Sequence, residues 1–162
     1  MNYQFTIQFR EEHIKYACRK YFARFVGIIF PVVCLLLAAF AILQMVSGKA
    51  DWITGMFMAI ALFGVGIIVA AYFQNLKYRL SQFRKTGNSI SYKLSEELFK
   101  AKSAMGSMEL KWESFKALWI FQKVWLLVFD KSGYLTLPAD QISNEAKEFL
   151  KRKIVSVGGK IK

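Results

Sequence analysis

The sequence is poor in the residues that build metal centres and disulfide frameworks. It contains two cysteines, Cys18 and Cys34, and a single histidine, His13. A structural zinc site needs about four nitrogen or sulfur ligands, and a disulfide framework needs several cysteine pairs. We therefore expect no metal and no cofactor, with His13 as a polar residue near a helix start. Cys34 lies in an apolar run, where a free thiol acts as a small hydrophobic group.

Acidic residues and prolines are also scarce. The chain has 11 acidic against 23 basic residues, a formal net charge of +12, and two prolines in 162 residues. A hydrophobic content of 55% excludes a disordered or collagen-like chain. The excess of positive charge fits a nucleic acid, a membrane surface or membrane topology, so its position along the chain has to decide between them.

Two long stretches lack charge altogether. Residues 25–46 and 52–73 are apolar runs of 22 residues each. A helix of that length measures about 33 Å, against about 30 Å for the hydrocarbon core of a bilayer. We predict two transmembrane helices, the first kinked at Pro31. The five residues 47–51 between them are too few to recross a membrane, so the helices form an antiparallel hairpin.

Basic residues flank the predicted hairpin on both sides. Residues 1–24 and 74–93 each contain five lysines or arginines, whereas the loop contains only Lys49. Such a bias places both termini in the cytoplasm. The expected organisation is an N-terminal strand and amphipathic helix in 1–24, spans in 25–46 and 52–73, an extracytoplasmic loop in 47–51, a basic juxtamembrane linker in 74–88 and a cytoplasmic domain in 89–162.

A cleavable signal peptide is the competing interpretation of the first run. Ala39-Phe40-Ala41 has the small-residue pattern of a cleavage site. However, 24 residues precede the run, and the run is longer than the usual apolar region of a signal peptide. We therefore expect the first run to remain in the protein as a span.

Small residues recur on one side of the second run, at Gly55, Ala59, Gly66 and Ala70. Small residues four apart allow helices to approach closely. We expect them to pack against the first span of the same chain, with self-association into a homo-oligomer as the alternative. Neither run contains Asp, Glu, Lys, Arg or His, which argues against an ion channel or transporter.

The segments outside the hairpin have the alternation of β-strands. Tyr3–Phe9 alternates apolar and polar residues, and Glu11–Arg24 has a helical apolar stripe. A lone strand is not stable, so Tyr3–Phe9 should pair with the C-terminal part. Six further strands are expected there, at 90–94, 98–102, 108–112, 115–121, 124–129 and 134–137, with a turn at 130–133.

A helix should close the chain. Ser143 is a predicted N-cap, and an apolar helical face follows at Ala146, Phe149, Leu150 and Ile154. Seven strands and a C-terminal helix form the inventory of a pleckstrin-homology-like (PH-like) barrel. The expected fold class is therefore a membrane α+β protein, in which a two-helix hairpin carries a small PH-like β-barrel or sheet. The aromatic residues expected in its core are Trp112, Phe115, Trp119, Phe121, Trp125 and Phe129.

Three sequence segments carry a resemblance to a known family. They are FTIQFREEHIKYACRKYF before the spans, KWESFKALWIFQKVWLLVFDKSGYLTLPADQIS after them, and the terminal EAKEFLKRKI. Together, Trp112, Phe115, an aromatic strand pair and Leu137-Pro138 resemble the YcxB-like family of bacterial membrane proteins. The resemblance implies the bacterial cytoplasmic membrane and a domain similar to bacterial PH domains. It carries over no catalytic or binding residue.

The sequence favours a non-enzymatic membrane protein whose PH-like domain binds protein partners. An enzyme is disfavoured because Glu96 and Glu97 are adjacent and would point to opposite faces of a strand, while Asp130 and Ser132-Gly133 fit a turn. Nucleic-acid binding is also disfavoured, since the Trp-rich strands have mixed charge. The alternative is recognition of an anionic lipid surface by basic residues that flank the membrane and end the chain. Those residues are Lys77, Arg79, Arg84, Lys85, Lys151, Arg152 and Lys153.

Overall fold

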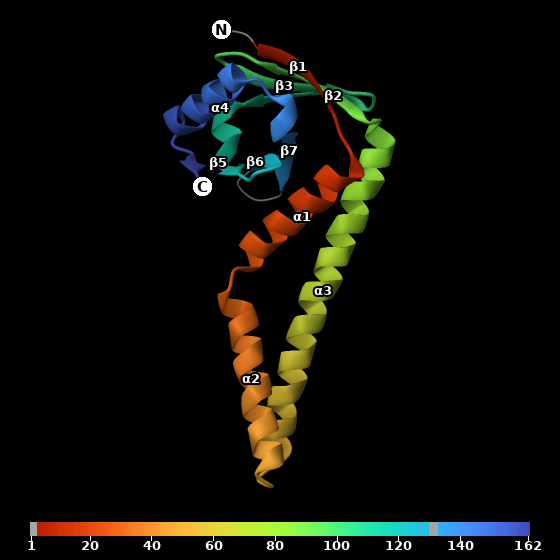
Figure 1. The fold of residues 1–162 in the computed structure, drawn as a ribbon, viewed down its shortest axis with the longest axis vertical. Helices are drawn as coiled ribbons and strands as arrows, with labels where there is room; N and C mark the ends of the chain where they lie inside the picture. The colour runs from red at the N-terminus through yellow and green to blue at the C-terminus, as the bar shows by residue number, and fades with distance from the viewer. Residues whose placement is uncertain (1–2, 130–132) are drawn as a thin grey trace. The chain divides into compact units, whose positions relative to one another are not determined.

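The computed structural model describes residues 3–129 and 133–162. The described chain divides into two compact units (Figure 1). The hairpin unit is Cys18–Lys77, and the sheet unit combines Met1–Ala17 with Tyr78–Lys162. Asp130, Lys131 and Ser132 of the predicted turn lie outside the described residues.

The first predicted span is interrupted near its start. Helix α1 (Glu11–Val26) ends before Gly27, whose φ of 69° is accessible mainly to glycine, and α2 (Ile29–Val46) begins after it. Phe25 and Val26 therefore belong to α1. Pro31 is the third residue of α2, in the first turn, where a backbone N–H has no partner within the helix. The break falls at Gly27 rather than at Pro31.

The second span continues well beyond its apolar run. Helix α3 (Trp52–Thr86) has 35 residues, so the segment expected to be a juxtamembrane linker is helical up to Thr86. No glycine or proline interrupts residues 74–86, and Arg84 and Lys85 lie in the last turn, where basic side chains favour the helix dipole. Gly87, with φ of 72°, ends the helix.

The sheet unit contains two four-stranded sheets. Sheet A has the order β1-β2-β3-β4, and sheet B has the order β7-β6-β5-β8. The strands are β1 (Tyr3–Gln8), β2 (Ser89–Leu94), β3 (Leu98–Ser103), β4 (Gly106–Lys111), β5 (Phe115–Ile120), β6 (Val124–Phe129), β7 (Tyr134–Pro138) and β8 (Lys160–Ile161). Two short 3₁₀ helices, η1 (Trp112–Ser114) and η2 (Ala139–Gln141), and α4 (Asn144–Ser156) complete the unit.

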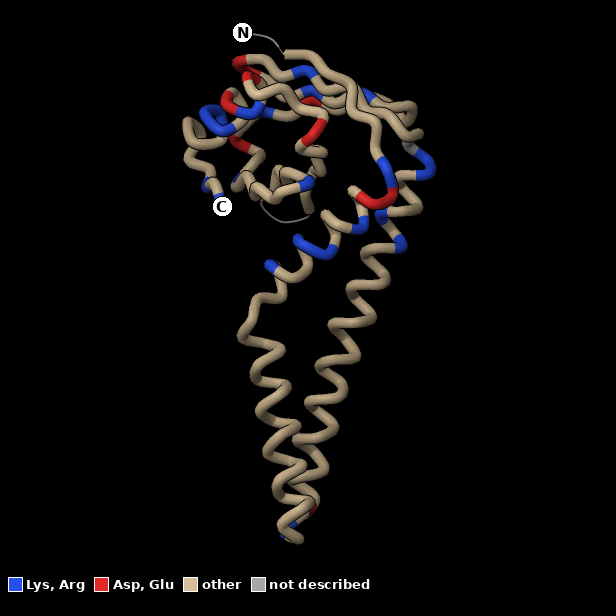
Figure 2. The backbone as a smooth tube through the Cα atoms, viewed as in Figure 1, with Lys and Arg blue, Asp and Glu red and all other residues tan. Residues whose placement is uncertain are grey.

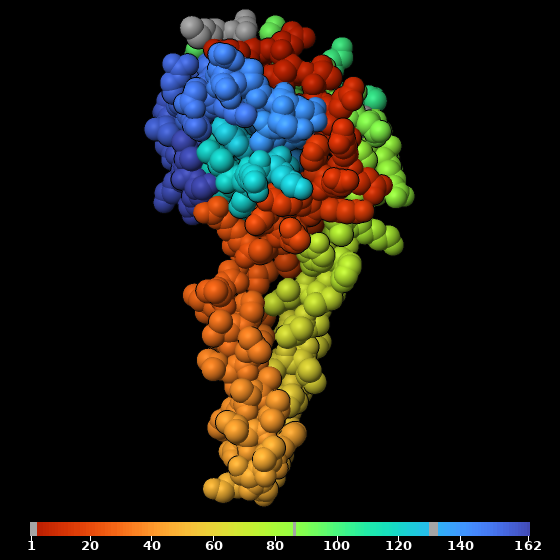
Figure 3. All heavy atoms as spheres, in the orientation of Figure 1, coloured from red at the N-terminus to blue at the C-terminus, as the bar shows by residue number. Residues whose placement is uncertain are grey.

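The N-terminal strand joins the C-terminal sheet, which confirms the predicted pairing. Strand β1 runs antiparallel to β2, with Tyr3 opposite Leu94 and Ile7 opposite Ile90. The side chain of Gln141 also accepts from Gln8 N at 2.7 Å and donates to Gln8 O at 2.8 Å, which ties β1 to η2. In the space-filling view, the red start and the blue end of the chain lie in the same unit (Figure 3).

The core of the sheet unit combines residues from both sheets and α4. Ser143 accepts from Ala146 N at 3.3 Å as the predicted N-cap, and the four predicted face residues of α4 are all buried. Among the predicted core aromatics, Trp112, Phe115 and Trp125 are buried, whereas the other three are half-buried. Strand β8, two residues parallel to β5, was not predicted. The architecture is an α+β combination of two apolar helices and two sheets.

Candidate functional surfaces

Helices α2 and α3 are long and apolar enough to cross a membrane, over Ile29–Val46 and Trp52–Lys85. Large apolar side chains are exposed along them, among them Leu43 at 65% and Phe63 at 72%. Figure 2 shows α2 and the first part of α3 as stretches without a charged residue. A soluble protein rarely exposes so much contiguous apolar surface, so an apolar environment suits these helices better than water.

The two helices meet along a line of side chains that the sequence did not single out. On α3, Thr54 and Ala61 are buried, and on α2 Cys34 and Ala41 are buried. A Cβ added at Gly64 would lie 3.1 Å from Cys34 Sγ, so glycine permits this close approach. The packing line therefore has small residues, as helix pairs in membranes commonly do.

The predicted small-residue stripe lies elsewhere. Gly55, Ala59, Gly66 and Ala70 are all exposed. A Cβ added at Gly55 or Gly66 would meet no atom within 4 Å. The structure thus places the stripe on an open side of α3, not against α2.

The loop between the helices is held by a side-chain cap at the start of α3. Asp51 Oδ1 accepts from Thr54 N at 2.8 Å and from Thr54 Oγ1 at 2.9 Å. These hydrogen bonds hold the pKa of the Asp51 carboxyl below its ordinary value. The cap begins α3 one residue after Asp51, so the turn between the helices is short and defined.

The seven predicted lipid-facing basic residues fall into two groups. Lys77, Lys85 and Arg152 are exposed and form no ion pair with the part of the chain that the structure describes. The other four contact protein groups. Arg84 lies 3.5 Å from Glu11, Lys151 lies 2.8 Å from Glu148, Lys153 pairs with Glu96, and Arg79 packs on Tyr134.

Arg79 belongs to the wall of a cavity in the sheet unit. Its Nη1 donates to Tyr134 O at 3.2 Å, and its Cζ lies 3.8 Å from the centre of the Tyr134 ring. The cavity has a volume of about 220 Å³ and a largely apolar lining that includes Phe9, Phe83 and Ile90. Arg79 is therefore a packed side chain rather than a free surface charge, which the sequence did not indicate.

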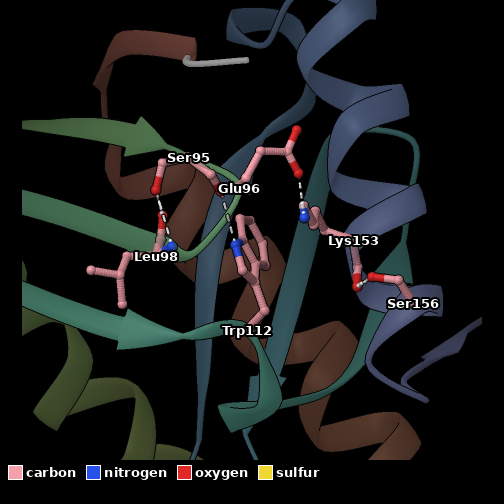
Figure 4. A network of polar contacts seen from close by, with 6 residues as sticks. All are labelled: Ser95, Glu96, Leu98, Trp112, Lys153 and Ser156. Carbon is pink, nitrogen blue, oxygen red and sulfur yellow. Dashed lines mark hydrogen bonds and ion pairs between the residues drawn. The ribbon is translucent and has the colours of Figure 1, made fainter.

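A polar network joins the turn between β2 and β3 to α4 (Figure 4). Trp112 Nε1 donates to Ser95 O at 3.0 Å, and Leu98 N donates to Ser95 Oγ at 3.0 Å. Lys153 on α4 pairs with Glu96 in the same turn. The hydrogen bond and positive charge of Lys153 hold the pKa of Glu96 below its ordinary value. The network is structural, since its groups bond to one another.

In the part of the chain that the structure describes, the residue types that bind metals are scattered. Within residues 3–129 and 133–162, no group of three or more His, Cys, Asp or Glu side chains is placed to hold a metal ion. Both cysteines are buried, and Cys18 Sγ lies 3.8 Å from Asn75 Oδ1.

The fold places this chain in a class of proteins that combine a unit of two β-sheets with a pair of long apolar helices. Residues 94–154 match the family model described as YcxB-like protein, so the chain contains a YcxB-like domain and the predicted resemblance is confirmed. The match runs from the end of β2 into α4 and leaves out β1, the apolar helices and β8. No curated protein and no solved structure matches the chain.

Proposed function

We propose that the chain is a non-enzymatic integral membrane protein that spans the bacterial cytoplasmic membrane twice and presents a PH-like domain to cytoplasmic protein partners. The observation that carries the proposal is the exposed apolar surface of α2 and α3, where Leu36, Leu43 and Leu62 are each more than 60% exposed. Burying such side chains in lipid recovers roughly 25 cal/mol for each Å² removed from water.

The pairing of β1 with β2 supports the proposed topology. Strand β1 precedes the apolar hairpin and β2 follows it, yet they exchange hydrogen bonds over six residue pairs. Two strands of one sheet lie on the same side of a bilayer, so both ends of the hairpin share a side. The basic residues on both flanks favour the cytoplasm for that side.

The strand inventory supports a PH-like domain. Seven of the strands, β1 to β7, form two antiparallel sheets, and α4 contacts β5, β8 and η1. These are the parts expected of a PH-like barrel with its C-terminal helix. Scaffolds of this type support binding at their surfaces, so the function has to be argued from those surfaces.

Strand β4 supports a protein partner. It is an edge of sheet A that pairs only with β3 among the described residues; Met105 just before it is 60% exposed, and Met108 within it is 37% exposed. An open edge can receive an extended segment of another protein. A photocrosslinker at position 105 in the full chain should give a discrete heterologous adduct in cells, whereas one at position 147 on α4 should not. Equal adducts from both positions, or none, would contradict a partner at this edge.

Topology can be tested with single cysteines in a Cys18→Ser, Cys34→Ala background. Ser47→Cys in the loop should react with a membrane-impermeant maleimide in intact cells. Ser107→Cys on β4 should react only after the membrane is permeabilised. Equal labelling of both positions in intact cells, or recovery of the chain in the soluble fraction, would contradict the proposal.

Anionic lipid recognition is the second candidate, supported by the exposed Lys77, Lys85 and Arg152 without ion pairs in the described chain. Each such charge near an anionic leaflet is worth about 1 kcal/mol. Native mass spectrometry of the detergent-extracted chain should show fewer retained anionic lipids for Lys77→Gln/Lys85→Gln than for Lys116→Gln/Lys147→Gln. Equal retention by the two variants would exclude this candidate.

A further inference from the structure

The outer face of sheet A contains several lysines that come from different strands and are not adjacent in the sequence. Strand alternation turns Tyr92, Leu94 and Phe99 into the core, which places the residues between them on the opposite face. That face therefore contains four lysines and one acidic residue. They are Lys93, Lys100, Lys102, Lys111 and Glu109.

The strand register brings like charges together at the centre of this face. Lys93 on β2 lies directly opposite Lys100 on β3, and Lys102 is two residues further along β3. Like charges in opposed positions destabilise a sheet. Glu109 on β4 compensates only one of them, with Oε1 2.6 Å from Lys100 Nζ. A face built for stability alone would alternate the two signs across the strands.

These lysines surround a hollow of about 250 Å³ on the sheet surface. Six side chains with hydrogen-bond donors lie around it, those of Gln4, Ser91, Lys93, Lys100, Lys102 and Ser107, and the lining also includes Tyr92, Ala101 and Glu109. All six can donate hydrogen bonds, and the three ammonium groups add positive charge. The hollow lies wholly within the sheet unit.

We propose that this hollow binds a small, water-soluble, phosphate-bearing anion. Lysine is a compact point charge suited to phosphate oxygens, and the neighbouring hydroxyl and amide groups supply further donors. The ligand extends the proposed function, because the PH-like domain would then respond to a soluble metabolite as well as to a protein. Met105 and Met108, which the proposed function uses, are not among the residues that line the hollow.

The chemistry of the face favours a small anion over larger occupants. A protein interface of ordinary size has an apolar or aromatic centre, and single-stranded nucleic acid uses aromatic side chains as stacking platforms. Apart from Ala101 and Tyr92, the residues around the hollow are polar or charged, and the aromatic Tyr92 is 1% exposed and turned into the core. Docking on a bilayer surface also gains from apolar side chains that enter it, and this face offers none around the hollow.

The test uses the full chain in nanodiscs of zwitterionic lipid at low salt, with pyrophosphate as the probe in calorimetric titrations. The unaltered chain should bind pyrophosphate more tightly than inorganic phosphate. Lys93→Gln/Lys102→Gln should weaken binding about tenfold or more, because it removes two charge-assisted contacts. The same variant should keep or raise the melting temperature, since it removes like-charge repulsion.

Two further variants make the test specific. Lys116→Gln/Lys147→Gln removes the same charge from β5 and α4, away from the hollow, and should leave the affinity within about twofold. Glu109→Gln releases Lys100 and should strengthen binding by about two- to threefold. The proposal is overturned if pyrophosphate does not bind, if both double variants weaken binding equally, or if only phosphatidylglycerol vesicles or a poly-glutamate peptide bind. Incorporation of the chain into nanodiscs is scored separately, so failure of the membrane proposal is distinguishable.

Discussion

Trp112 connects several parts of the sheet unit through one side chain. It is 2% exposed, and its ring lies 5.8 Å from Phe99, 6.0 Å from Phe115 and 5.9 Å from Phe149 between ring centres. The alternation of strand residues predicted its burial. Its hydrogen bond to Ser95 was not predictable, because that bond depends on a turn 17 residues earlier in the chain.

Replacement of Trp112 by phenylalanine should destabilise the sheet unit by about 2–3 kcal/mol. The change removes the donor to Ser95 O and leaves unfilled volume in the core. Chemical denaturation of the full chain in detergent, followed by circular dichroism, measures the effect. Trp52→Phe, at a side chain that is 76% exposed, is the matched control and should cost less than about 0.5 kcal/mol. Equal costs for the two variants would contradict the role of Trp112.

The ion pair of Glu96 with Lys153 predicts a specific response to acid. The hydrogen bond from Lys153 lowers the pKa of Glu96 from its ordinary value of 4.5 in the folded state. A lowered folded pKa gives stability that is present above the unfolded value and is lost as the pH falls through the folded value. The melting temperature should therefore fall less steeply below pH 4.5 in Glu96→Gln than in the unaltered chain.

Glu97→Gln is the control for that measurement, since Glu97 is an exposed neighbour without an ion pair in the described chain. It removes the same formal charge, and its melting temperature should fall at acidic pH as steeply as that of the unaltered protein. If Glu96→Gln and Glu97→Gln give the same profile, the pair with Lys153 does not contribute to folding stability.

At the scale of single elements, the sequence predicted where most strands and helices lie and of which type they are. It did not predict how α2 and α3 pack against each other. Strands β1 to β7 and α4 follow from alternation and helical spacing in residues such as Tyr3–Phe9. The side of α3 that faces α2 did not follow, because this helix is apolar on every side within its span and no period distinguishes one face. The contact of Gly64 with Cys34 depends on shape complementarity between two helices, which periodicity does not encode.

Short elements and helix ends escaped prediction for a different reason. Strand β8 has two residues, too few to show alternation, and it exists because Gly158 and Gly159 turn the chain back against β5. The basic residues after the apolar run predict a linker, whereas the structure continues α3 through them to Thr86. Charge does not prevent a helix when no glycine or proline interrupts it.

Gly159→Ala should destabilise the junction of α4 with β8. A Cβ at this position would lie 2.7 Å from Ile154 Cγ2 and 2.9 Å from Ile154 O. Ile154 is fully buried, so it has little room to yield, and the expected cost is about 1–3 kcal/mol. Thermal unfolding of the full chain in detergent measures the change.

Gly55→Ala is the matched substitution, since an added Cβ there meets no atom within 4 Å. It should leave stability unchanged or raise it by up to about 1 kcal/mol, because alanine favours a helix. A loss of stability in Gly55→Ala similar to that in Gly159→Ala would show that both glycines are packed, and would favour self-association through the exposed small residues of α3.

At the scale of the whole molecule, the fold separates lysines from acidic residues that cancel each other's charge along the sequence. Residues 94–142 have no net formal charge, so the sequence indicated a neutral domain with basic flanks. In the structure, Lys100, Lys102 and Lys111 lie on the outer face of sheet A, whereas Glu96 and Glu97 lie in the turn after β2. The separation follows from strand register, which is a property of the fold and not of composition.

The pairing of β1 with β2 is also a property of the whole chain, since it joins segments on either side of the apolar hairpin. If the hairpin spans a membrane, as proposed, this sheet forms only when both ends of the hairpin lie on the same side of it. Thr6 and Ser91 are directly opposite in this pair, and their hydroxyl oxygens are 2.8 Å apart. Cysteines at these two positions are close enough to form a disulfide.

Disulfide formation in Thr6→Cys/Ser91→Cys, in the Cys18→Ser, Cys34→Ala background, is the most direct test of the central claim. Membranes from expressing cells are treated with a mild oxidant, and the chain is analysed without reducing agent. We expect a compact intramolecular crosslink in the membrane fraction and none in Thr6→Cys/Ser107→Cys, whose positions lie on opposite edges of sheet A. Absence of the crosslink from membrane-inserted Thr6→Cys/Ser91→Cys, or equal crosslinking of the control pair, would contradict the account.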